Sequence, residues 1–247
     1  RASCPYWTHN EIQITLIRDV NVQLFEALKI IRDRGKADDG SPRRVDLVCG
    51  FTPLHFRTFL TAELTSRYEA DSVDVRIGQF GDIPGAMRQC LAEPPESAVV
   101  ILEWADLDPR LGYRSSGGWR PDRLVDIVES VDIRLSQFEK TLTELAEKTT
   151  LAVCLPTLEL PPMFPSPNGL ADHAALNLQS LVADFAVRLA ETGSIRIVDA
   201  RHLDRISNPA TRFDAASDLR SGFPYSMDHA SALANAVASM LRPKPAM

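Results

Sequence analysis

The segment Val45–Cys49, which reads VDLVC, is a short apolar run that ends at Gly50, and a stretch with helical periodicity (53–68) follows it. The β-branched residues of the run and the turn residues around it predict a β-strand, and the periodic stretch predicts an α-helix. The same pairing of a short apolar run with a helical pattern recurs along the chain. The further predicted strands cover 73–77, 98–102, 151–155 and 195–198, and the further predicted helices cover 82–93, 121–148, 172–192 and 229–241.

This alternation predicts an α/β fold in which about five parallel strands form one sheet. Parallel strands need crossover connections, and these are almost always right-handed, so helices are expected on both faces of the sheet. The predicted architecture is therefore a doubly wound, three-layer sandwich. In an open parallel sheet, ligands bind at the carboxyl ends of the strands, and we expect the functional site at that edge.

The composition excludes several classes of protein. The chain has 247 residues, of which 45% are apolar and 24% are charged, so it can form a sizeable core and intrinsic disorder is not expected. Its 27 Lys and Arg and 33 Asp and Glu give a net charge of −6, which argues against broad nucleic-acid binding. No apolar run reaches the roughly 18 residues of a membrane span. Four scattered cysteines without C-x-x-C spacing predict neither a disulfide framework nor a zinc site, and a reducing cytoplasm is expected.

The chain outside the predicted sheet is expected to form a helix and several loops. Residues 1–44 are predicted to hold an N-terminal helix (11–33) and a connector, and residues 45–242 are predicted to form the α/β domain. Since the sequence does not begin with Met and ends in a proline-containing segment, we expect a piece of a longer polypeptide. The predicted loops are the polar segment 35–42, the Gly- and Ser-rich segment 113–119 and the proline-rich segment 156–169.

The residues that follow the first predicted strand can be interpreted in two ways. Gly50 allows a sharp turn, Phe51 follows it, and Thr52 is predicted as the N-cap of the next helix, with Pro53 at its first position. In the first interpretation Thr52 is a cap and nothing more. In the second, its hydroxyl group also faces a ligand, where the amides of the helix N-terminus favour negative charge.

Further candidates follow the later strands. Gly81 comes after the second strand, and the acidic segment Glu103–Asp108 with its aromatic neighbour Trp104 comes after the third. The acids are either solvated turn residues or part of a site. Asp228 and His229 open the last helix, either as an N-cap and a surface residue or as the general base of a hydrolase. A nucleophile such as Thr52 would have to lie beside that base.

The order of these segments resembles the SGNH-like N-terminal domain of FkbH-like proteins, over roughly residues 45–241. The segments that carry the resemblance are Gly50–Thr52 after the first strand, Gly78–Gly81 after the second, and Phe223–Ala230 before the closing helix. The resemblance implies a flavodoxin-like five-stranded sheet related to SGNH/GDSL hydrolases, followed in the parent protein by a HAD-type, phosphatase-like domain. It also implies a role in making glyceryl-type acyl units on carrier proteins for polyketide biosynthesis.

The chain departs from the hydrolase pattern at most of its motifs. SGNH hydrolases have Gly-Asp-Ser where this chain has Gly50–Thr52, so a more hindered threonine replaces the serine nucleophile. Gly81 matches the second motif, but Glu103–Asp106 replaces Gly-x-Asn-Asp and holds no Asn to stabilise an oxyanion. The final Asp-x-x-His motif is replaced by Asp228 next to His229, and adjacent helical residues do not point to one place.

We therefore expect a degenerate SGNH-like domain that binds, or helps to transfer, an acyl group of the glyceryl type. The expected partners are an acyl carrier protein, or its phosphopantetheinyl acyl group, and a C-terminal HAD-like domain. The alternative is an active SGNH-type esterase or acyltransferase that uses Thr52, His229 and Asp228. The expected substrate-binding residues are Gly50, Phe51, His55, Gly81, Glu103 and Trp104, and no metal, cofactor, nucleic acid or membrane is expected.

Two other functions, a HAD-type phosphotransfer enzyme and a nucleotide-binding module, are matched only superficially. Asp106-Leu-Asp108 has the spacing of a HAD acid pair, but Glu103–Ala105 separates it from the strand and Arg110 stands at the later position. Gly78-x-x-Gly81 is not the G-x-G-x-x-G pattern of dinucleotide binding, and the chain has no P-loop motif.

Overall fold

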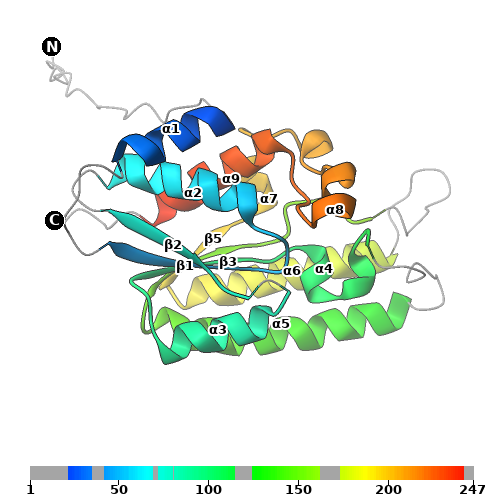
Figure 1. Ribbon diagram of the computed structural model, residues 1–247. Helices are drawn as coiled ribbons and strands as arrows, with labels where there is room; N and C mark the ends of the chain where they lie inside the picture. Colours follow the sequence, from blue (N-terminus) through cyan, green and yellow to red (C-terminus); the bar gives the residue numbers. More distant parts are fainter. Residues whose placement is uncertain are drawn as a thin grey trace, which may run out of the picture.

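The computed structural model describes residues 22–34, 42–68, 72–79, 81–114, 124–161 and 173–241. Its centre is a five-stranded sheet in the order β2-β1-β3-β4-β5, and all neighbouring strands are parallel (Figure 1). The predicted α/β fold is therefore confirmed, with the strand order and three layers of a flavodoxin-like fold. The strands are β1 (Arg43–Cys49), β2 (Val73–Ile77), β3 (Ser97–Ile101), β4 (Thr150–Cys154) and β5 (Ile195–Val198).

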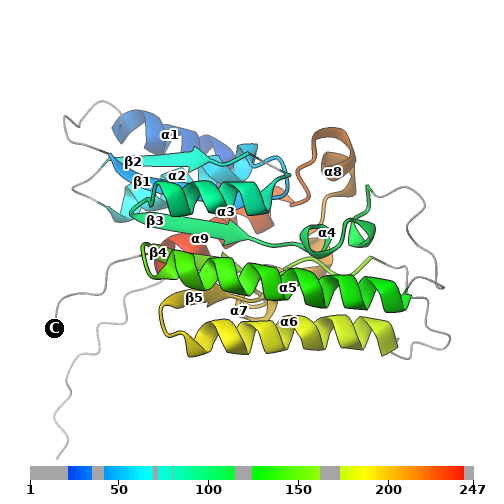
Figure 2. The same ribbon diagram turned by 90° about the horizontal axis from the view of Figure 1, so that it is seen from below.

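Helices cover both faces of this sheet (Figures 1 and 2). One face carries α1, α2 and α9, and the other carries α3, α5 and α6. The long helices are α1 (Leu24–Arg34), α2 (Leu54–Arg67), α3 (Ile83–Ala92), α5 (Leu124–Ala146), α6 (His173–Glu191) and α9 (Met227–Met240). The short ones are α4 (Trp104–Leu107), α7 (Ala200–Leu203) and α8 (Ala215–Ser221), with 3-10 turns η1 (Pro109–Leu111) and η4 (Pro209–Thr211).

The two hydrophobic cores follow from the two-residue period of the strands. Leu47 of β1 and Val99 of β3 belong to the core under α2 and α9, whereas Val48 and Val100 belong to the core under α3, α5 and α6. All four side chains are buried. A parallel sheet covered on both faces needs apolar residues at successive positions, and this is why the strands appear in the sequence as continuous apolar runs.

The N-terminal helix packs against the core under α2 and α9. Of the predicted helix 11–33, the structure describes α1, and residues 11–21 lie outside the described residues. Ala27 is fully buried against α2, and the hydroxyl of Ser231 in α9 donates a hydrogen bond to the carbonyl of Val22. Among the described helices, none is long and apolar enough to cross a membrane.

Two helix starts differ from those expected. Pro53 is the N-cap of α2 and Thr52 lies one residue before it, so the expected capping by Thr52 is wrong. Ser226 caps α9 by accepting a hydrogen bond from the backbone of His229, so Asp228 is a first-turn residue and not the cap. Of the predicted loops, most of 35–42 and 113–119 and residues 162–169 lie outside the described residues.

The core on the α2 side provides a test of the packing. Leu64→Ala in α2 removes a fully buried side chain and leaves a cavity, so the free energy of unfolding is expected to fall by about 2–5 kcal/mol. Leu219→Ala in α8 is the matched control, because that leucine is 65% exposed and its loss is expected to change the same quantity by less than about 0.5 kcal/mol. Urea denaturation measures both, and similar losses in the two variants would contradict this packing.

Candidate functional site

A pocket of about 420 Å³ lies at the carboxyl edge of the sheet, where the sequence predicts the site. Its wall includes the turn after β1, α4, the segment after η1, α5 and the segments before α9. Its apolar and aromatic lining residues are Phe51, Ile83, Pro84, Trp104, Ala105, Pro109, Leu111, Tyr113, Phe138, Leu158, Phe213 and Pro224. Its charged residues are Glu103, Asp106, Arg114, Arg134, Glu159 and Asp218. No serine, threonine, cysteine or histidine is among the described lining residues.

Five of the six residues expected to bind substrate line this pocket: Gly50, Phe51, Gly81, Glu103 and Trp104. The sixth, His55, is not among the lining residues. Its ring instead packs edge to face against Phe223, with the ring centroids 5.3 Å apart.

Thr52 lies beside α8 and is not one of the residues that line the pocket. Its backbone N–H donates to the carbonyl of Gly222 at 2.9 Å. Gly222 adopts the left-handed conformation (φ 74°) that ends α8, and a Cβ atom there would lie 2.9 Å from the Thr52 hydroxyl. The hydroxyl of Thr52 is thus packed against the C-terminus of α8.

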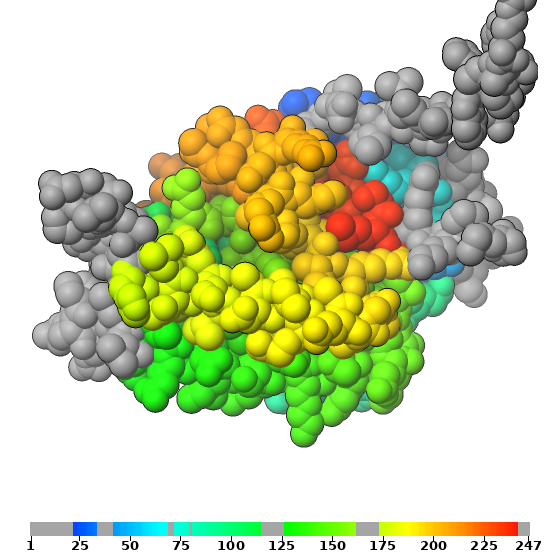
Figure 3. All heavy atoms as spheres, turned by 180° about the vertical axis from the view of Figure 1, so that it is seen from behind, coloured from blue at the N-terminus to red at the C-terminus, as the bar shows by residue number. Residues whose placement is uncertain are grey.

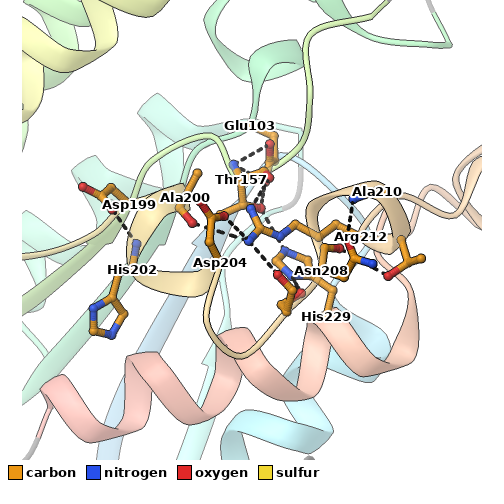
Figure 4. Close-up of polar contacts among 12 residues, drawn as sticks. Glu103, Thr157, Asp199, Ala200, His202, Asp204, Asn208, Ala210, Arg212 and His229 are labelled. Carbon is orange, nitrogen blue, oxygen red and sulfur yellow. Dashed lines mark hydrogen bonds and ion pairs between the residues drawn. The ribbon is translucent and has the colours of Figure 1, made fainter.

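His229 is buried, and other side chains occupy both of its ring nitrogens (Figure 4). Nε2 lies 2.9 Å from the hydroxyl oxygen of Thr157, and Nδ1 lies 2.8 Å from that of Ser207. Burial, together with the nearby charge of Arg212, lowers the pKa of His229 to about 3, so the ring is neutral at physiological pH. Asp228, the next residue toward the N-terminus, is exposed to solvent. The structure therefore does not join His229 to Thr52 through a hydrogen bond between described side chains.

The partner of this histidine, Thr157, also contacts the buried carboxylate of Glu103. The Thr157 hydroxyl donates to Glu103 Oε1 at 2.7 Å, and the Tyr225 hydroxyl donates to the same oxygen at 2.7 Å. The backbone N–H groups of Thr157 and Leu158 donate to the carboxylate as well. Because the Thr157 proton points to Glu103, Thr157 accepts from the Nε2–H of His229. Burial raises the pKa of Glu103, although these four donors oppose the shift.

Arg212 holds the far side of the same network (Figure 4). Its side chain is almost fully buried and donates to the carbonyls of Thr157 at 3.1 Å and Ser207 at 2.9 Å, and to Asp204 Oδ1 at 2.7 Å. Thr157, Ser207 and Arg212 are not among the site residues predicted from the sequence. Thr157 could have been found from its place just after β4, but no local pattern marks Ser207 or Arg212.

The two oxygen atoms of the Asp106 carboxyl group have different surroundings. Its Oδ2 accepts a hydrogen bond from the backbone N–H of Glu103 at 2.8 Å. Its Oδ1 lies against Gly50, where a Cβ atom would come within 1.6 Å. Burial is the largest influence and raises the pKa of Asp106 to about 7, although the Glu103 N–H, Arg114 and Arg134 lower it.

The second acid of the Asp106-Leu-Asp108 segment serves a different purpose. Asp108 is buried away from the pocket and accepts hydrogen bonds from the backbone and guanidinium of Arg110. At the rim, Arg114 pairs with Asp218 at 3.3 Å. Asp106 and Asp108 therefore do not line one site, as a HAD acid pair would.

Figure 3 shows the molecule from behind the view of Figure 1. On that side α6 (yellow) lies beside α5 (green), with the segment that follows β5 (orange) and the end of α9 (red) above them.

Comparison with known proteins finds a likeness in structure, whereas no family model and no curated protein matches the chain. It is to the N-terminal part of the protein BF1531 from Bacteroides fragilis, which contains a phosphatase domain and is complexed with Mg. The TM-score is 0.61 and the sequence identity 11%, over 84% of this chain and 54% of that one. This likeness shows the fold alone, and the chain spans about half of that structure.

In the described part of this chain, no three His, Cys, Asp or Glu side chains are grouped as metal ligands.

The contact between Gly50 and Asp106 can be tested with a double-mutant cycle. Gly50→Ala forces a Cβ atom into the Asp106 carboxyl group, so the free energy of unfolding is expected to fall by about 1–3 kcal/mol. In an Asp106→Ala background the clash is gone, and the same substitution is expected to cost at least about 1 kcal/mol less. Equal losses in the two backgrounds, measured by urea denaturation, would show that the contact is absent.

The buried carboxylate of Glu103 provides a second test. Glu103→Gln replaces one acceptor oxygen by an NH₂ group that faces hydrogen-bond donors, including two backbone N–H groups that cannot rotate. The expected loss in the free energy of unfolding is about 2–3 kcal/mol. Glu191→Gln, at an exposed position of α6, is the matched control and is expected to change it by less than about 0.5 kcal/mol. A loss for Glu103→Gln no larger than for the control would rule out the network.

Proposed function

We propose that this chain is a degenerate SGNH-like domain of an FkbH-like protein and that its pocket holds an acyl group, of the glyceryl type, on the phosphopantetheinyl arm of a carrier protein. The observation that carries the proposal is the pocket itself. Its volume of about 420 Å³ falls in the range of small-molecule sites, and its wall combines apolar side chains with a few charged groups. Such a lining suits a short acyl chain with polar substituents.

The side chains at the carboxyl edge favour binding over hydrolysis. A serine-type hydrolase needs a hydroxyl nucleophile within hydrogen-bond reach of its base. Here both ring nitrogens of His229 are engaged by Thr157 and Ser207, and neither Thr52 nor His229 lines the pocket. The alternative, an active esterase built on Thr52 and His229, would require both side chains to rearrange.

The likeness to the Bacteroides fragilis structure supports the proposed parent protein. That structure contains a phosphatase domain, and the part matched by this chain covers 54% of it. A domain of this fold within a phosphatase-containing protein is what the FkbH-like organisation requires. We accordingly propose a HAD-like domain and a carrier protein as partners, in the cytoplasm.

Binding of a minimal ligand tests this function. S-acetylpantetheine, an acyl thioester of the carrier's arm, is expected to bind the 247-residue chain at pH 6 with a Kd of roughly 10–100 µM, because a ligand of this size gains about 0.3 kcal/mol per heavy atom. Isothermal titration calorimetry measures the affinity. Ala105→Trp fills the pocket and is expected to weaken binding at least tenfold. Ala190→Trp, at an exposed position of α6, is the matched control and is expected to bind normally.

Turnover in the same samples separates the two functions. With p-nitrophenyl acetate, the unmodified chain, Thr52→Ala and His229→Ala are expected to show the same background rate, because no nucleophile and base are joined. A rate well above background that either substitution abolishes would establish the esterase. Absence of binding by the unmodified chain would overturn the proposed function.

A further inference from the structure

We propose that Asp106 is a ligand-binding residue of this pocket, and that its protonated carboxyl group donates a hydrogen bond through Oδ1 to a carbonyl oxygen of the bound acyl group. The inference rests on the proposed function, which places an acyl group in the pocket, and goes beyond it by naming the group that recognises the ligand.

The geometry around Asp106 separates its two oxygen atoms. Oδ2 accepts a hydrogen bond from the backbone N–H of Glu103 at 2.8 Å, so it acts as an acceptor and the proton belongs on Oδ1. Among the described residues, none donates a hydrogen bond to Oδ1. Asp106 and Gly50 both line the pocket, so the free oxygen lies at the pocket wall.

A purely structural role would use only half of this arrangement. Capping the short helix α4 requires one oxygen of Asp106 and one backbone N–H. It does not require the second oxygen to lie against Gly50, at a position where no residue with a Cβ atom fits without a shift. The close approach places Oδ1 beside Gly50, which itself lines the pocket.

The electrostatics of the pocket make the protonated form accessible near neutral pH. Burial and the neighbouring Glu103 carboxylate raise the pKa of Asp106 to about 7, against the opposing influence of two arginines and one backbone N–H. A neutral carboxylic acid in an apolar site is a strong hydrogen-bond donor. The titratable and charged groups that interact with it are Cys49 of β1, Glu103 before α4, Arg114 after η1, Arg134 of α5 and Tyr225 before α9. Asp218 of α8 and Glu159 after β4 also line the pocket.

This arrangement links ligand binding to proton uptake. A ligand that accepts the hydrogen bond stabilises the protonated acid and so raises the pKa of Asp106 in the complex. Below the pKa of the free protein the affinity is then independent of pH. Above that value each complex formed takes up as much as one proton from solvent, and the affinity falls by as much as tenfold per pH unit.

Calorimetry at several pH values tests the inference. S-acetylpantetheine is titrated into the unmodified chain at pH 6, 7 and 8, in two buffers of different ionisation enthalpy. The affinity is expected to be about fivefold to tenfold lower at pH 8 than at pH 6, and the two buffers are expected to reveal proton uptake at pH 8. S-ethylpantetheine has a thioether in place of the thioester and so lacks the acyl carbonyl oxygen, and it is expected to show neither effect.

Two matched variants identify the titrating group. Asp106→Asn keeps a donor of the same shape without a titrating proton, so its affinity is expected to be the same at all three pH values and within about threefold of the unmodified chain at pH 6. Asp184→Asn, at an exposed position of α6 outside the pocket, is the matched control and is expected to retain both the affinity and the pH dependence.

The outcomes distinguish this inference from the proposed function. Binding of S-acetylpantetheine without pH dependence or proton uptake would overturn the role of Asp106 and leave the acyl-binding function standing. Absence of binding at every pH would overturn the function itself. Proton uptake is measured on the unmodified chain, so the test holds even if Asp106→Asn does not fold.

Discussion

The buried carboxylate of Glu103 needs hydrogen-bond donors on all sides, and the carboxyl edge of the sheet is organised around this need. An ionised group away from water is costly unless donors replace its hydration. Thr157, just after β4, and Tyr225, just before α9, supply hydroxyl groups to Glu103 at the end of β3. Three segments that are far apart in sequence are thus held together by one side chain.

This network also decides which residues remain available for ligand chemistry. The Thr157 hydroxyl donates a hydrogen bond to Glu103 and therefore accepts one from the Nε2–H of His229, while the Ser207 hydroxyl forms a hydrogen bond with Nδ1. The histidine that a hydrolase would use as its base becomes part of the structural interior. Asp106 keeps one oxygen at the pocket wall. At this edge its carboxyl group, and not His229, is therefore available to a ligand.

Much of the fold could be predicted because its signals are local. The strands at 73–77 and 195–198 have the predicted bounds, since β-branched runs between turn residues leave little choice. Thr52 was predicted as a cap and is not, because Pro53 takes that position and the chain turns first to meet Gly222. The short helices α4, α7 and α8 were not predicted, since helices of four to seven residues carry almost no periodic signal.

The sequence by itself determined the layered α/β architecture and the edge at which the pocket lies. Alternating apolar runs and helical stripes dictate parallel strands, and in a parallel sheet the loops that follow the strands all lie at the carboxyl edge. Only the tertiary structure decided which side chains meet there. The partners of Glu103 and His229 lie 54 to 122 residues and 22 to 72 residues away in sequence, respectively. Hydrogen bonds over such separations depend on how the crossovers pack, and no pattern of neighbouring residues records that.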